Sequence, residues 1–148
     1  MNTISQGFFI TSSKEKIFEA ISTPEGFNNW WTKRCSGIPK LDSTFNFYFS
    51  EEYDWKAKVS KLIPNEAIEF TMTAASESWE DTVFGFQVSE ESNNTIYIEF
   101  YHKNWKSVNK EFQITNYCWA NLFFQLKEYV ETGVVLEFSQ RNKHIESC

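Results

Sequence analysis

The middle of the chain alternates apolar and polar residues, and its last third repeats apolar residues at helical spacing. From Thr44 to Tyr101, every second residue of successive short runs is apolar, as in strands with one buried face. Phe45, Phe47 and Phe49 share such a face. Five runs of this kind, separated by polar turns, predict an antiparallel meander that is buried on one side only.

The last third predicts one long helix, from about Glu111 to Glu131. Its bulky residues recur three or four positions apart and therefore line one face: Trp119, Leu122, Phe123, Leu126 and Val130. Gly133 follows, and glycine is the residue type that commonly ends a helix in the left-handed conformation. A helix with so large an apolar face must lie on an extensive surface, which the strands supply.

The first third predicts a strand and two short helices. Residues 5–10 are expected to form the strand, and a helix from about Lys14 to Ile21 follows, with serine and threonine before it as capping residues. Thr23 and Pro24 then start a second helix, since proline suits the first helical position. A loop is expected over residues 32–43. These elements predict an α+β domain.

Length and composition limit the classes of protein that remain possible. A chain of 148 residues fits one domain. The net charge of −6 and the absence of long basic runs argue against a nucleic-acid surface. Mean hydropathy is −0.47 and no apolar stretch approaches the ~20 residues of a membrane span. We expect a cytoplasmic protein, because three scattered cysteines suit a reducing compartment.

The end of the chain divides into two parts. Val135, Leu136 and Phe138 are apolar enough to pack against the body of the protein. Residues 140–148 have little to bury and are expected to form a flexible polar tail. The predicted organisation is therefore a single domain over residues 1–139 and a tail over residues 140–148, whose removal should leave the melting temperature nearly unchanged.

Two local patterns resemble a known family. They are Phe18-Glu-Ala-Ile-Ser-Thr-Pro-Glu25 followed by Trp30-Trp31, and Trp119 with Leu126-Lys-Glu-Tyr-Val-Glu-Thr-Gly133. Both resemble the activator of heat-shock protein 90 ATPase homologue family, within the helix-grip superfamily of START domains and pollen allergens. The resemblance implies a curved antiparallel sheet wrapped around a long C-terminal helix, two short helices after the first strand, and often a cavity between helix and sheet.

Few residues are candidates for catalysis or for binding a metal. His102 ends a predicted strand beside Tyr101, and His144 lies in the polar tail. Cys118 stands beside Trp119 and is expected to be buried and unreactive. Metal sites need three or four clustered ligands, and phosphate loops need clustered glycines. Neither pattern occurs, so we expect no metal and no cofactor.

Aromatic residues make up 18% of the chain, and they either fill the core or line a cavity within it. Ala57 is expected on the inner face, where a hollow core would leave room for a larger side chain. Our hypothesis is a cavity that binds a small apolar or amphipathic molecule. Trp31 and Tyr101 would lie near its mouth, and the other lining residues would be Trp55, Phe70, Phe84, Phe86, Phe100 and Trp119.

Two alternatives remain open. The same cavity could serve a cyclase-like or dehydratase-like enzyme, with His102 or Tyr101 as the acid or base. The domain could instead be a stand-alone interaction module related to co-chaperones. A ligand-binding domain needs only a cavity, whereas an enzyme also needs a buried polar pair with shifted pKa values. We expect a monomer or a weak homodimer.

Overall fold

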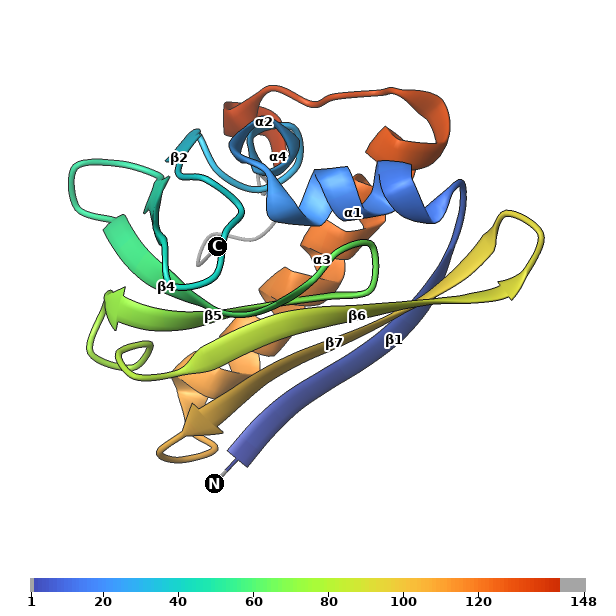
Figure 1. Cartoon of the computed structure of the whole chain (residues 1–148). Coiled ribbons are helices and arrows are strands. Elements are labelled where there is room, and N and C mark those ends of the chain that lie inside the picture. The colour runs from blue at the N-terminus through green and yellow to red at the C-terminus, as the bar shows by residue number, and fades with distance from the viewer. Residues whose placement is uncertain (1, 142–148) are drawn as a thin grey trace.

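A computed structural model describes residues 2–141, which form one antiparallel sheet with helices on a single side of it (Figure 1). The strands, in chain order, are β1 (Asn2–Thr11), β2 (Arg34–Ser36), β3 (Thr44–Tyr48), β4 (Asp54–Ile63), β5 (Ala67–Ala74), β6 (Val83–Ser92) and β7 (Thr95–Trp105). Their spatial order is β1-β7-β6-β5-β4-β3-β2, and each neighbouring pair is antiparallel. The predicted meander and the α+β class are confirmed.

The long helix α3 (Lys110–Thr132) runs across the apolar face of the sheet (Figure 1). Asn109 caps its start, since the side chain of Asn109 accepts a hydrogen bond of 3.0 Å from the Phe112 N–H. Gly133 ends the helix with φ at 80°, a left-handed conformation that glycine adopts without steric cost. The five residues of the predicted apolar stripe are all buried, so the helix and its inner face are as predicted.

Two short helices, α1 (Lys14–Ser22) and α2 (Pro24–Asn28), follow β1. Thr23 joins them, because its hydroxyl accepts from the Gly26 N–H at 3.0 Å and donates to the Glu19 carbonyl at 2.9 Å. A Cβ atom on Gly26 would lie 2.4 Å from the Glu19 oxygen, so only glycine allows the helices to pack this closely. Both helices match the prediction.

The structure corrects the predicted loop over residues 32–43, because Arg34–Ser36 form β2 and pair with β3. This edge strand could not be predicted from the sequence pattern, because it has no run of alternating apolar residues.

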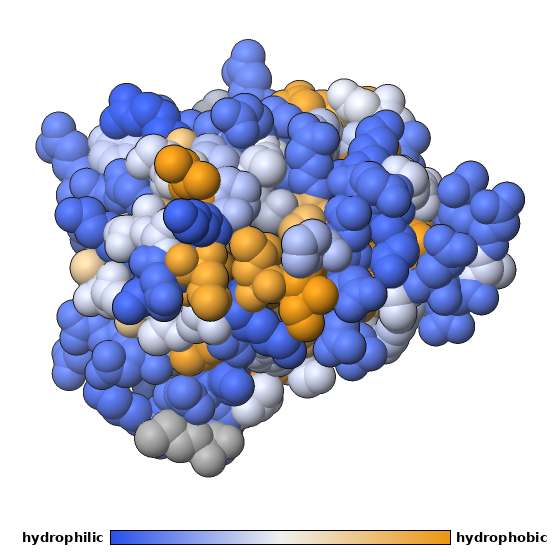
Figure 2. Space-filling view, in the orientation of Figure 1, coloured by the Kyte–Doolittle hydropathy of each residue, from blue (hydrophilic) through white to orange (hydrophobic). Residues whose placement is uncertain are grey.

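On the surface seen in the orientation of Figure 1, hydrophilic residues predominate, and apolar side chains gather near the centre of the visible face (Figure 2). Ile38 and Leu41, in the loop after β2, are 68% and 53% exposed.

The core between the helices and the middle of the sheet is filled. Phe70 stacks on Phe84 at 5.2 Å between ring centroids, and Phe86 lies 5.1 Å from Phe100. Ala57 is completely buried, and it pairs with Phe45 on one neighbouring strand and Met72 on the other. The structure therefore leaves no open space beside Ala57 for a larger side chain.

The chain after Gly133 ends in the short helix α4 (Phe138–Arg141), which is anchored by an arginine. Arg141 is 7% exposed and donates to three backbone carbonyls: Leu136 at 3.0 Å, Thr32 at 3.1 Å and Asn28 at 2.6 Å. The carbonyl of Arg141 in turn accepts from the side chains of Asn121 and Gln125 on α3. The segment is thus held to α3 and to the end of α2 by hydrogen bonds.

This anchor changes the expectation for the end of the chain. Val135 and Leu136, which were expected to pack against the body, are 45% and 43% exposed. Helix α4 extends past Ser139, the last residue of the predicted domain, so we propose that Gln140 and Arg141 belong to the domain. The rest of the expected tail, residues 142–148, lies outside the described residues.

Ending the chain after Ser139 is expected to lower the melting temperature by about 5–10 °C. Hydrogen bonding to a charged group contributes about 1.5–3 kcal/mol to the free energy of unfolding. Each kcal/mol that is lost lowers the melting temperature of a chain of this size by a few degrees. The point variant Arg141→Met should reproduce most of this loss in the full-length chain, because it keeps the side-chain stem. Gln140→Met, at an exposed neighbour, is the matched control for thermal unfolding. Equal melting temperatures for the two point variants would contradict the anchor.

Candidate functional site

A pocket of about 590 Å³ lies beyond the filled core, where α3 begins. Its walls come from the segment after α2, the end of β3 and the start of β4, the loop between β5 and β6, the first half of α3, and α4. The residues that line it are Trp31, Phe49, Tyr53, Trp55, Ser76, Ser78, Trp79, Lys110, Glu111, Ile114, Thr115, Cys118, Trp119, Leu122 and Phe138.

Five aromatic side chains of the pocket contact one another in a closed circle, which we call the aromatic wall: Trp31, Phe49, Trp55, Trp79 and Trp119. Successive ring centroids are 5.4, 5.4, 4.6, 5.9 and 4.9 Å apart, from Trp31 through Phe49 and back to Trp31. These spacings fall in the range where aromatic pairs attract beyond simple burial. Each ring comes from a different segment, so the wall joins five parts of the chain.

A buried histidine lies behind the aromatic wall. His102 is 0% exposed, and its Nδ1 accepts a hydrogen bond of 3.1 Å from the Trp119 indole N–H. Its Nε2 lies 2.8 Å from the Thr82 hydroxyl, which donates to the Trp79 carbonyl at 2.6 Å. Burial lowers the pKa of His102 to about 3, so the imidazole is neutral at physiological pH.

The structure brings together three of the eight predicted site residues. Trp31, Trp55 and Trp119 line the pocket. The other inner-face residues of the prediction are at most 1% exposed within the filled core: Phe70, Phe84, Phe86 and Phe100. A period of two assigns these residues to the correct face of the sheet, but it does not say where along that face the helix closes on it.

The eighth predicted residue, Tyr101, lies on the other face of the sheet. Its hydroxyl donates to Glu69 at 2.7 Å, and burial together with this carboxylate raises the pKa of the phenol. Neighbouring residues of a strand point to opposite faces, so Tyr101 and His102 cannot both face the pocket. The structure puts neither of them in its lining.

Several lining residues were missed by sequence reasoning. Trp79 lies in a polar loop that shows no alternation of apolar and polar residues. The only indication of its role in the sequence is that it is a large aromatic residue among polar ones. Phe138 belongs to a segment assigned only a packing role. Cys118 is half-buried in the pocket wall, so its expected full burial is wrong. Cys35, outside the pocket, has its pKa raised to about 12 by burial and by the charge of Glu25.

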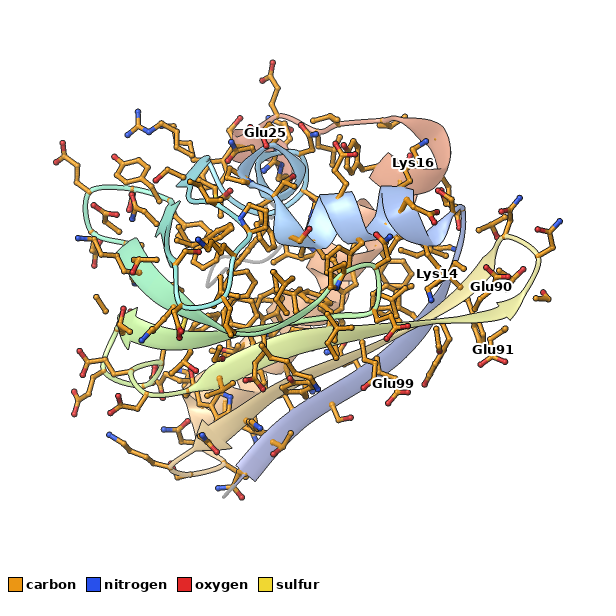
Figure 3. The ribbon with its side chains drawn as sticks, in the orientation of Figure 1. Lys14, Lys16, Glu25, Glu90, Glu91 and Glu99 are labelled. Atoms are coloured by element: carbon orange, nitrogen blue, oxygen red, sulfur yellow. The ribbon has the colours of Figure 1, made fainter. Side chains whose placement is uncertain are left out.

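Several exposed charged residues belong to elements that do not line the pocket. Figure 3 shows Glu90 and Glu91 projecting from the hairpin between β6 and β7, and Lys16 and Glu25 projecting from α1 and α2. Within residues 2–141, no three His, Cys, Asp or Glu side chains lie close enough to hold a metal ion. No helix in this part of the chain is both long and apolar enough to cross a membrane.

An antiparallel sheet gripping a long C-terminal helix, with a pocket at one end, defines the protein as an α+β helix-grip domain. The chain belongs to the family described as activator of Hsp90 ATPase homolog 1-like protein, whose profile matches residues 11–131. The family resemblance inferred from the sequence is thereby confirmed. No match was found among curated proteins.

Solved structures support the same assignment. The Aha1 dimer from Colwellia psychrerythraea is 33% identical over 90% of this chain and 98% of its own, with a TM-score of 0.82. Protein SSP2350 from Staphylococcus saprophyticus is 20% identical over 91% of this chain and 96% of its own, with a TM-score of 0.76. Protein MLL2253 from Mesorhizobium loti is 17% identical over 86% and 95%, with a TM-score of 0.75. The last two show the fold alone.

Proposed function

We propose that this protein binds a small apolar or amphipathic molecule in the pocket beside α3. The observation that carries the proposal is the aromatic wall, which lines a space of about 590 Å³. Ligand pockets commonly enclose about 300–1,000 Å³ and are lined by apolar and aromatic residues with a few polar groups. Aromatic residues fill the core elsewhere in the protein, but at this position they leave a space large enough for a drug-sized molecule.

The polar residues of the pocket favour an amphipathic ligand. Ser76 and Ser78 come from the loop between β5 and β6, and Lys110 and Glu111 come from the first turn of α3. A ligand with one polar end can place its apolar body against the aromatic wall and its polar end among these groups. The proposal includes no reaction, because neither His102 nor Tyr101 lines the pocket.

Ile114→Trp is expected to weaken binding of the apolar probe 1-anilinonaphthalene-8-sulfonate at least tenfold. Ile114 lines the pocket, and an indole at this position takes up space that the probe needs. Gln113→Trp is the matched control, because Gln113 precedes Ile114 on α3 but is exposed and outside the pocket. Probe fluorescence measures binding, and thermal unfolding checks that both variants fold. Equal binding by the two variants, or none by the unmodified protein, would refute the proposal.

Self-association is a second candidate, because the Colwellia psychrerythraea relative was solved as a dimer. We propose that two copies meet through the outer face of α3. Phe124 and Tyr117, two turns apart on that face, are 75% and 60% exposed. Sedimentation velocity over a concentration range tests the proposal, and Phe124→Lys should shift the protein toward the monomer. Unchanged sedimentation of this variant would place the contact elsewhere.

A further inference from the structure

We propose that His102 is the positioning residue of the pocket: it fixes Trp119 and the loop that carries Trp79, and so holds the aromatic wall open to a ligand. The inference rests on the proposed ligand-binding function. Its basis is a chain of three hydrogen bonds that runs from the indole of Trp119 through His102 and Thr82 to the backbone of Trp79.

The direction of every hydrogen bond in this chain is fixed by chemistry. An indole N–H only donates and a carbonyl only accepts. The Trp119 N–H therefore requires a lone pair on Nδ1 of His102, and the Thr82 hydroxyl uses its hydrogen on the Trp79 carbonyl. The Thr82 oxygen is then left to accept from Nε2. One neutral tautomer, with its hydrogen on Nε2, satisfies the whole chain, and the protonated imidazole does not.

The two ends of the chain are separate parts of the fold that meet at the pocket. Trp119 belongs to α3, whereas Trp79 belongs to the loop between β5 and β6. Their rings are 5.9 Å apart, and the ring of Trp79 lies 4.6 Å from the imidazole in an edge-to-face arrangement. His102, on β7, therefore contacts both segments from behind the wall. One further link joins loop and helix, from the Trp79 indole to the Thr115 hydroxyl at 3.4 Å.

The side chains around His102 explain why another residue cannot take its place without cost. It is enclosed by the hydroxyl of Thr82 and by the rings of four neighbours: Trp79, Phe84, Trp105 and Trp119. An apolar residue at this position would leave the Trp119 N–H buried without its acceptor and would release Thr82. Buried donors that lose a partner are strongly disfavoured, so the indole and the loop would turn toward solvent.

The test uses substitutions of His102 that each keep only one of the two hydrogen bonds made by the imidazole nitrogens. Asn places an acceptor where Nδ1 lies and can keep the Trp119 bond, whereas Gln places a donor where Nε2 lies and can keep the Thr82 bond. His102→Leu keeps neither. The readouts are the nitrogen and proton shifts of the Trp119 indole, the imidazole nitrogen shifts of the unmodified protein, and the dissociation constant of 1-anilinonaphthalene-8-sulfonate.

We expect the Trp119 indole signal to stay near its original position in His102→Asn and to move in His102→Gln and His102→Leu. Probe binding should fall at least tenfold in His102→Leu and less in the other two variants. The imidazole should remain in the single Nε2–H tautomer at neutral pH. His144→Gln leaves one histidine in the chain and removes any overlap of signals. If His102→Leu does not fold, the contrast between Asn and Gln still decides the question.

An indole signal that is the same in all variants, or a mixture of imidazole tautomers at neutral pH, would overturn the inference. So would unchanged probe binding by a folded His102→Leu variant. Failure of the proposed function gives a different result. In that case the unmodified protein does not bind the probe, while the indole and imidazole shifts still report whether His102 positions Trp119.

Discussion

Replacing Ala57 by Phe is expected to destabilise the protein by about 3 kcal/mol or more, or to prevent folding. Ala57 is 0% exposed, and its cross-strand neighbours Phe45 and Met72 are also buried. Overpacking of a dense core costs typically about 1–3 kcal/mol and occasionally more, and a phenyl ring adds far more than one methylene group. Chemical denaturation followed by circular dichroism measures the change in unfolding free energy.

The matched control adds a ring where the structure has room. Ser78 lines the pocket and is half-buried, so Ser78→Phe should change the free energy of unfolding by less than about 1 kcal/mol. The same substitution should weaken probe binding, because its ring competes for the pocket. Similar free energies of unfolding for the Ala57→Phe and Ser78→Phe variants would contradict the description of a filled core at Ala57 and an open pocket at Ser78.

Acidification is expected to lower the free energy of unfolding from its value at neutral pH. The decrease should start near pH 6.5 and is caused by His102. The folded-state pKa of about 3 lies below the ordinary value of 6.5. Between these values the unfolded chain binds a proton that the folded protein does not, so stability falls as pH falls. For this one group the loss amounts to about 2 kcal/mol between about pH 7 and pH 5, and it grows toward pH 3.

The variant His102→Asn supplies the control for this prediction. It cannot titrate, so its free energy of unfolding should change less between about pH 7 and pH 5 than that of the unmodified protein. Both proteins are compared in a His144→Gln background, in which His102 is the sole imidazole of the chain. Parallel pH profiles for the two proteins would show that His102 carries an ordinary pKa.

The elements of the fold could be predicted from the sequence because local rules determine them. The helical stripe on α3 and the alternation along β3 to β7 report which face of each element is buried. The cap at Thr23 and the helix end at Gly133 follow from backbone geometry that neighbouring residues specify. Only β2 was missed among the strands of the described region, because an edge strand needs no apolar face.

The site could be predicted only in part because its position depends on where distant segments meet. Phe84 and Trp55 belong to the same apolar pattern, yet one is sealed in the core and the other lines the pocket. Nothing in the sequence near Trp79 indicates that its loop turns back over α3. In the sequence, Arg141 is one charge in a polar tail, and two of the three carbonyls that it binds, those of Asn28 and Thr32, are more than 100 residues away.

The tryptophans of the pocket and of the adjoining core are also expected to give this protein a distinctive optical property. All six tryptophans belong to one network of ring contacts, with centroids 4.6 to 6.3 Å apart: Trp30 contacts Trp31, Trp31 contacts Trp119, Trp119 contacts Trp79, and Trp79 contacts both Trp55 and Trp105. The electronic transitions of indoles this close couple with one another, so the rings are expected to give an exciton contribution to the circular dichroism spectrum. This contribution should depend on the mutual orientation of the rings, so a colourless ligand that tilts one of them is expected to change the spectrum.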